Sequence, residues 1–105
     1  MDFKVPAQKL GLEVDEYIEL IELFLETGIK DLKGLEDAAA NNDAHMAAEY
    51  SHSLKGSSGN LGLIDIYESS KKIEDRARDN NLEGITEAIH KIDQEFKNIR
   101  AATEQ

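Results

Sequence analysis

Apolar residues recur along this chain at alternating spacings of three and four, which is the period of amphipathic helices and not of strands. The longest stripe predicts one helix over residues 14–40. Asp43 is a good N-cap for the next helix, whose stripe reaches Leu61, and Gly62 stands where a terminating residue would sit. The first half of the chain therefore predicts two consecutive helices.

Two further helices are predicted in the second half. A stripe over Leu63–Ala77 predicts the third long helix, which the polar run at 79–81 breaks. Asn81 is the predicted cap of a fourth helix that carries apolar residues from 85 to 99. Short connections favour antiparallel neighbours, so the predicted fold is all-α, an antiparallel up-down-up-down four-helix bundle. A short additional N-terminal helix over about residues 2–11 is expected across one end.

Composition limits the class of protein. A chain of 105 residues with 40% hydrophobic residues buries one core, so residues 1–105 are predicted to form a single domain. Its net charge of −10 argues against nucleic acid and anionic membranes as partners, because both would repel it. The chain has no cysteine, no apolar run approaching about 18 residues and no signal-peptide pattern. A cytoplasmic monomer with protein partners is expected.

The chemistry concentrates between His52 and Gly62, where the sequence reads HSLKGSSGNLG. In a helix, His52, Lys55, Gly56 and Gly59 fall at spacings that place them on one face. This arrangement puts a basic nitrogen, a cation and two missing side chains on one strip of surface. It is suited to docking a phosphoryl group on an imidazole.

Helical phase places His52 on the outside of the predicted bundle. At about 100° per residue, it lies roughly 150° from the direction of the apolar stripe. An isolated surface histidine is usually only solvated, but Gly56 and Gly59 change this interpretation. Each glycine costs roughly 0.5–1 kcal/mol relative to alanine inside a helix. Close approach of another protein to the imidazole is a specific reason to keep that surface free of side chains.

The stretch from His52 to Gly62 resembles the signature of histidine phosphotransfer (HPt) domains, the four-helix-bundle carriers of multistep two-component phosphorelays. The resemblance covers nearly the whole chain, because these domains also show a short leading helix and a long acidic helix before the motif. They also carry an apolar-Glu pair about three turns into the next helix, and here that pair is Ile73-Glu74. Gly59 departs from many relatives, in which alanine is frequent.

The resemblance implies roles for individual residues. His52 corresponds to the phosphorylated histidine, Lys55 to the cation beside the phosphoryl group, and Glu74 to the acceptor that bonds the imidazole. If Glu74 accepts from Nδ1, it fixes the tautomer and leaves Nε2 free for in-line attack. Lys55 has a plainer interpretation as a solvated lysine, and Glu74 as a partner of Lys71 or Arg78. The predicted access and docking residues are Gly56, Gly59, Ala48 and Ser57.

The resemblance also implies the partners, which are response-regulator receiver domains, a hybrid sensor histidine kinase, or both. The chain carries no glycine-rich nucleotide loop of the P-loop kind, so we expect a phosphoryl carrier without its own ATP site rather than an enzyme. It also lacks a clustered acidic triad on loops. We therefore expect no cofactor of its own, with Mg²⁺ supplied by the receiver domain.

Metal binding and a purely scaffolding bundle are the competing classes. Glu49 to His52 and Glu87 to His90 both have the Glu-x-x-His spacing of di-iron bundles. Di-iron ligands project inward, whereas both pairs lie opposite the apolar stripes of their helices. A surface site formed by His45, Glu49 and His52 is the other metal candidate. A scaffold leaves the two glycines beside His52 unexplained, and the phosphotransfer hypothesis is therefore favoured.

Overall fold

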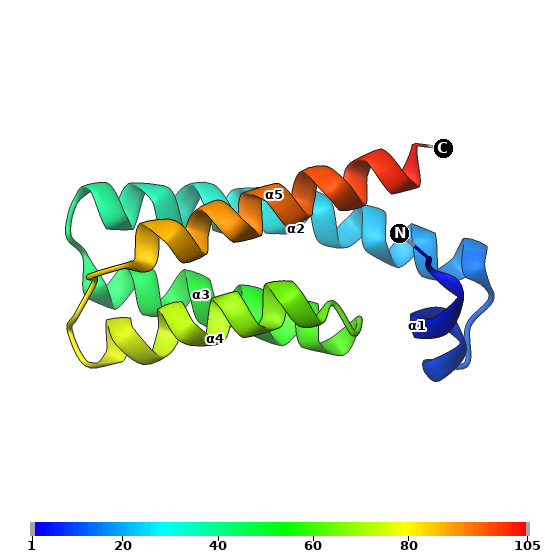
Figure 1. Cartoon of the computed structure of the whole chain (residues 1–105), viewed down its shortest axis with the longest axis horizontal. Helices are drawn as coiled ribbons and strands as arrows, with labels where there is room; N and C mark the ends of the chain where they lie inside the picture. The colour runs from blue at the N-terminus through cyan, green and yellow to red at the C-terminus, as the bar shows by residue number, and fades with distance from the viewer. Residues whose placement is uncertain (1, 105) are drawn as a thin grey trace.

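The computed structural model describes residues 2–104, and this part of the chain contains five helices and no strand (Figure 1). The four long helices α2 to α5 alternate in direction, each packs against the next, and α5 closes back on α2. The predicted up-down-up-down four-helix bundle is confirmed. The helices are α1 (Lys4–Lys9), α2 (Val14–Ala40), α3 (Ala44–Asn60), α4 (Ile64–Arg78) and α5 (Ile85–Thr103).

Local polar contacts set the ends of α2 and α3. The backbone N–H of Glu13 donates to Glu16 Oε1 at 3.0 Å, which satisfies a free donor before the first turn of α2. Asp43 caps α3 as predicted, because its Oδ1 accepts from the backbone N–H of Met46 at 3.1 Å. Gly62 follows α3 with a φ of +73°, a conformation that glycine adopts without strain. These contacts place the start and the end of α3.

The connection between α4 and α5 differs from the prediction. Asn81 was expected to cap the last helix, and this is wrong, since α5 begins at Ile85 after Gly84. Asn81 Oδ1 instead accepts from the backbone N–H of Glu83 at 3.0 Å, inside the connection. The Arg76 guanidinium donates to the Glu83 carbonyl, and Gly84 has a φ of +78° beside it. An Asx turn therefore replaces the cap.

The core lies between the four long helices, and α2 and α5 come very close within it. A Cβ added to Gly28 would lie 2.8 Å from Phe96 Cζ, so only glycine allows this approach. The Phe96 ring also meets Phe24 edge-on with centroids 5.4 Å apart. Tyr50 is half-buried, and its ring lies against Gly34 of α2.

The short helix α1 crosses one end of the bundle and is shorter than the predicted 2–11 (Figure 1). Within residues 2–104, α2 is the one helix that it packs against. Phe3 anchors it, being 7% exposed with its ring 5.9 Å from that of Tyr17. The Tyr17 hydroxyl donates to the Leu61 carbonyl, which ties α2 to the α3–α4 connection. This end of the bundle is therefore built around Tyr17.

Candidate functional site

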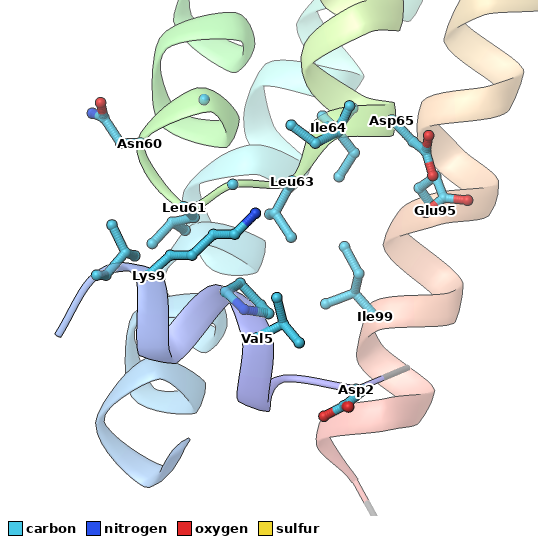
Figure 2. A pocket seen from close by; sticks show the side chains of 15 residues that line it. Asp2, Val5, Lys9, Asn60, Leu61, Leu63, Ile64, Asp65, Glu95 and Ile99 are labelled. Atoms are coloured by element: carbon cyan, nitrogen blue, oxygen red, sulfur yellow. The ribbon is translucent and has the colours of Figure 1, made fainter. Parts of the chain in front are cut away.

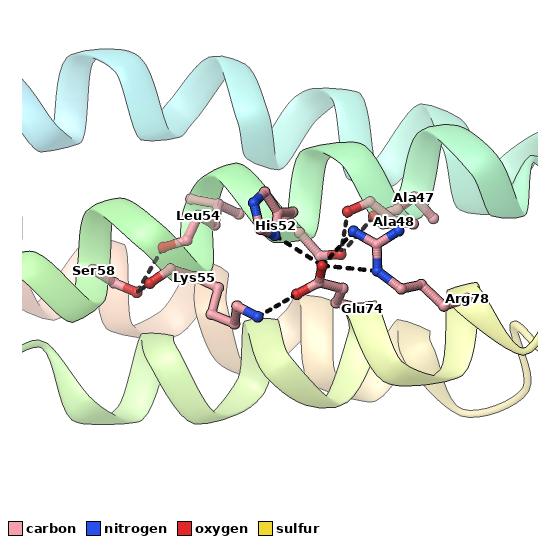
Figure 3. Close-up of polar contacts among 9 residues, drawn as sticks. Ala47, Ala48, His52, Leu54, Lys55, Ser58, Glu74 and Arg78 are labelled. Carbon is pink, nitrogen blue, oxygen red and sulfur yellow. Dashed lines mark hydrogen bonds and ion pairs between the residues drawn. The ribbon is translucent and has the colours of Figure 1, made fainter.

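The middle of α3 presents His52 to solvent on the side that faces α4. Leu54 and Ser58 are fully buried, which fixes the inward face of the helix. The His52 side chain, on the opposite side, is 63% exposed. Its Nδ1 lies 2.8 Å from Glu74 Oε2 of α4 (Figure 3). The structure thus brings together the histidine and the glutamate that the sequence singled out.

Glu74 is the centre of a cluster of positively charged and neutral donors on two helices. It is 4% exposed, and its Oε1 lies 2.7 Å from Lys55 Nζ. Its Oε2 accepts from Arg78 Nη2 at 2.6 Å and Nε at 2.9 Å, in addition to His52 (Figure 3). One buried carboxylate therefore holds three side chains in fixed positions.

The protonation state of this carboxylate follows from its neighbours. Burial on its own raises the pKa of Glu74, but the hydrogen bonds from Lys55, Arg78 and His52 outweigh burial. They lower the pKa of Glu74 from 4.5 to about 2. The carboxylate is therefore ionised at neutral pH and accepts hydrogen bonds from all three groups.

An ionised Glu74 determines the tautomer of the neutral His52 ring. Because a carboxylate only accepts, Nδ1 must carry the proton of the hydrogen bond, and Nε2 keeps its lone pair. Nε2 belongs to a side chain that is 63% exposed, so it is available to a reactant from outside. The site thus presents an oriented nucleophilic nitrogen at the surface.

Lys55 lies one turn after His52 and supplies the local positive charge. The hydrogen bond to Glu74 raises the pKa of Lys55 above its ordinary value, so the ammonium group stays charged at neutral pH. The side chain is 27% exposed, which leaves it accessible to a negatively charged group that approaches His52. Its pairing with Glu74 keeps it close to the imidazole in the meantime.

The predicted access residues occupy different environments. Gly56 is exposed, and an added Cβ would meet nothing within 4 Å. Gly59 is exposed too, but its Cβ would lie 3.2 Å from the Tyr67 ring, so this glycine also allows α4 to approach α3. Ser57 is half-buried, and its hydroxyl donates to the Ser53 carbonyl at 3.0 Å. The open surface beside His52 is therefore centred on Gly56.

The expectation that Ala48 borders the docking surface is wrong, since this residue is only 4% exposed. Ala48 precedes His52 by one turn, but four residues advance a helix by about 400°, which leaves a rotation of about 40°. The rotation has opposite senses at Ala48 and at Gly56, and it turns Ala48 towards the core while Gly56 stays exposed. It is part of the bundle core.

Sequence reasoning missed one member of the cluster and part of the neighbouring surface. It treated Arg78 as an alternative to His52 as a partner of Glu74, whereas the structure has both on one oxygen. Leu20 and Leu23 of α2 are 39% and 58% exposed, although both are large and apolar. The available signals were the i,i+4 spacing of Arg78 and the position of the two leucines off the core stripe of α2.

Pairing between α2 and α3 locates these leucines relative to the site. Ser53 Oγ donates to Asp31 Oδ2 at 2.8 Å, which fixes the register of the two antiparallel helices. Two turns before Asp31, Leu23 therefore lies level with the end of α3, beyond Gly56. Leu20, three residues earlier on α2, lies almost one turn further on.

The metal-binding alternative finds no support in the described chain. Glu49 and His52 are exposed on α3, and Glu87 and His90 are exposed on α5, so neither pair points into the bundle. Across residues 2–104, no group of three or more histidine, aspartate or glutamate side chains is placed to hold a metal ion.

Comparison with known proteins agrees with this site. A family model described as the Hpt domain matches residues 19–102, which include both α3 and α4. The chain belongs to the Hpt domain family. It is a histidine phosphotransfer protein of phosphorelays, in which Hpt domains work with receiver domains. Hpt domains are phosphoryl carriers and not enzymes in the usual sense.

A solved structure is similar over the whole length of this Hpt domain. It is the crystal structure of histidine-containing phosphotransfer protein B (HptB) from Pseudomonas aeruginosa PAO1, with 28% sequence identity and a TM-score of 0.85. The likeness covers 100% of this chain and 91% of that chain. A search of curated proteins finds no significant match. Between residues 2 and 104, no helix is long and apolar enough to cross a membrane.

Proposed function

We propose that His52 carries the phosphoryl group on Nε2, accepting it from the aspartyl phosphate of one receiver domain and passing it to another. The observation that carries this assignment is the hydrogen bond from Nδ1 to ionised Glu74, which leaves the Nε2 lone pair exposed. His45 and His90 are also exposed, but neither is held by a buried carboxylate in the described structure.

The transfer step needs little from this chain beyond position and charge. The Nε2 lone pair forms a bond to phosphorus while the bond from phosphorus to the aspartyl oxygen breaks, and the aspartate leaves as a carboxylate. Nδ1 keeps its proton throughout, and the positive charge that develops on the ring faces Glu74. We expect the receiver domain to bring Mg²⁺, which neutralises charge on the phosphoryl oxygens.

We assign Lys55 an electrostatic role in the same step. The transition state of phosphoryl transfer spreads negative charge over the peripheral oxygens, and a nearby ammonium group stabilises it. Lys55 is charged and partly exposed, and its Nζ lies 2.7 Å from Glu74 Oε1, which keeps the ammonium group near His52. A neutral residue at this position would slow transfer and shorten the lifetime of the phosphorylated histidine.

The face around Gly56 is the proposed docking surface for the receiver domain. It combines the side-chain-free surface at Gly56 with the exposed Leu20 and Leu23 of α2. Apolar side chains at the edge of a bare helix face supply contact area, and the absent side chain lets the partner reach His52. We expect one chain to bind one receiver domain at a time, and we expect the chain itself to be a monomer.

Phosphorylation by a labelled receiver domain tests the assignment. The unaltered protein should take up label that is stable in alkali and labile in acid, as a phosphohistidine is. His52→Gln should remain helical by circular dichroism and take up none, because the exposed side chain contributes little to the core. His45→Gln and His90→Gln are matched controls and should label normally. Label retained by folded His52→Gln and lost from one of these controls would refute the assignment.

A further inference from the structure

A groove lies at the end of the bundle where α1 crosses, between α1, the α3–α4 connection and α5 (Figure 2). Its volume is about 510 Å³. Its apolar lining comes from three separate parts of the chain that the fold brings together. The apolar residues are Val5, Pro6 and Leu10 from the α1 region, Leu61, Leu63, Ile64 and Ile66 around the connection, and Ile99 of α5.

The groove exists because α1 stays apart from α4 and α5. In the described chain α1 packs against α2 and no other helix, and Phe3 and Ala7 fix it there. The opposite wall is formed by the start of α4 and by Ile99 (Figure 2). The space between the two walls is therefore left open by the fold, and no side chain closes it.

Large apolar side chains are exposed around this groove. Val5 is 53% exposed, Leu10 is 45% exposed and Ile64 is 61% exposed. An apolar surface of this kind is unfavourable in water unless a partner covers it. Ile64 is the most exposed of the large hydrophobic side chains in residues 2–104, and it lies at the first position of α4. This concentration indicates a binding surface.

The charges at the rim indicate the chemistry of the occupant. Asp2, Asp65 and Glu95 line the groove, and Lys9 is its one cation. The whole chain carries a net charge of −10, which strengthens the negative potential there. Nucleic acid and anionic lipid are repelled by such a rim, whereas a segment with lysine or arginine beside large apolar residues complements it.

We propose that this groove docks a basic amphipathic segment of a partner protein, separately from the surface around His52. The nearest point of the groove on α3 is Gly59, seven residues after His52, which is about 10 Å along the helix. A segment held in the groove stays close to the phosphoryl-accepting nitrogen without covering it. The proposal goes beyond the transfer reaction, because the docking itself needs no phosphoryl chemistry.

A fluorescein-labelled peptide of leucine and lysine in helical spacing is the probe, and fluorescence anisotropy measures its affinity. Ile64→Lys places a positive charge, the same sign as the lysines of the peptide, in the groove and removes an apolar contact. It should therefore weaken peptide binding by at least about tenfold. Ile29→Lys is the matched control, because Ile29 is 41% exposed on α2 and the charge change is identical. It should bind like the unaltered protein.

Nuclear magnetic resonance and transfer assays complete the test. In the unaltered protein the peptide should shift the backbone amide signals of α1 and residues 61–66, and Ile64→Lys should accept phosphoryl groups from a receiver domain at the normal rate. Equal peptide affinities for Ile64→Lys and Ile29→Lys would overturn the proposal, since binding would then reflect net charge alone. Slow transfer to Ile64→Lys would also overturn it, by placing the groove inside the receiver footprint. Concentration-dependent dimers that Ile64→Lys abolishes, without peptide binding, would show a second copy as the occupant instead.

Discussion

Replacing Glu74 by glutamine should change how the free energy of unfolding depends on pH. In the folded protein the pKa of Glu74 is lowered from 4.5 to about 2 by its three donors. The Glu74 carboxyl group therefore binds a proton less tightly in the folded state than in the unfolded state. The resulting stabilisation is fully present above the unfolded pKa of 4.5 and is lost as the pH falls towards the folded pKa.

The size of this effect follows from the same two pKa values. Taken at face value they correspond to about 3 kcal/mol, at 1.36 kcal/mol for each pH unit. His52 and Arg78 are 63% and 53% exposed, so solvent screens part of the interaction. We therefore expect the free energy of unfolding of the unaltered protein to be about 1–2 kcal/mol higher than that of Glu74→Gln at pH 7. More than half of that difference should disappear between pH 5 and pH 3.

Urea unfolding followed by circular dichroism, at a series of pH values from 7 to 3, measures the difference. The other carboxylates titrate in both proteins, so subtracting the two curves isolates Glu74. Glu68→Gln is the control, because Glu68 is exposed on the same helix. Its curve should run parallel to that of the unaltered protein. A difference between the unaltered protein and Glu74→Gln that stays constant from pH 7 to pH 3 would refute the reasoning.

Three further substitutions test other parts of the structure. Gly28→Ala should destabilise the fold by about 1–3 kcal/mol in urea unfolding, because its Cβ would lie 2.8 Å from Phe96 Cζ, whereas Gly56→Ala should stabilise it by about 0.5–1 kcal/mol. Gly56→Leu should keep its helicity but accept phosphoryl groups more slowly from a receiver domain, and equal rates would contradict the proposed docking surface. Arg78→Ala should raise the pKa of Glu74 in a carboxyl ¹³C titration, since one of its lowering hydrogen bonds is lost. An unchanged pKa of Glu74 in Arg78→Ala would contradict a contribution of Arg78, since Lys55 and His52 would then lower that pKa on their own.

The helices and the outward direction of His52 were predictable because both depend on local periodicity. Apolar spacing defines which side of each helix is buried, and Asp43 offers its carboxylate to the next turn whatever the rest of the chain does. The contact between Glu74 and His52 was predicted only from a family resemblance, because the two residues lie on different helices. Periodicity alone does not specify which residues of two helices meet.

The predictions that were wrong concern features that depend on contacts between helices. Asn81 is a residue type that often caps helices, but Arg76 and Gly84 shape the connection so that α5 starts three residues later than a cap at Asn81 would place it. Ala48 lies one turn before His52, yet it is only 4% exposed because it packs into the core between the helices. Arg78 was weighed as a competitor of His52, although a carboxylate oxygen has room for more than one donor.

The anchoring of His52 through one nitrogen has a consequence for reversibility. In the proposed function the reacting nitrogen is Nε2, and the hydrogen bond to Glu74 uses only Nδ1. The empty and the loaded carrier therefore share the same anchor, and the His52 ring does not have to turn for one state to be exchanged for the other. Small reorganisation lowers the barrier equally for uptake and release. Such a carrier has no built-in direction, so the concentrations and phosphorylation levels of its partners decide which way the phosphoryl group flows.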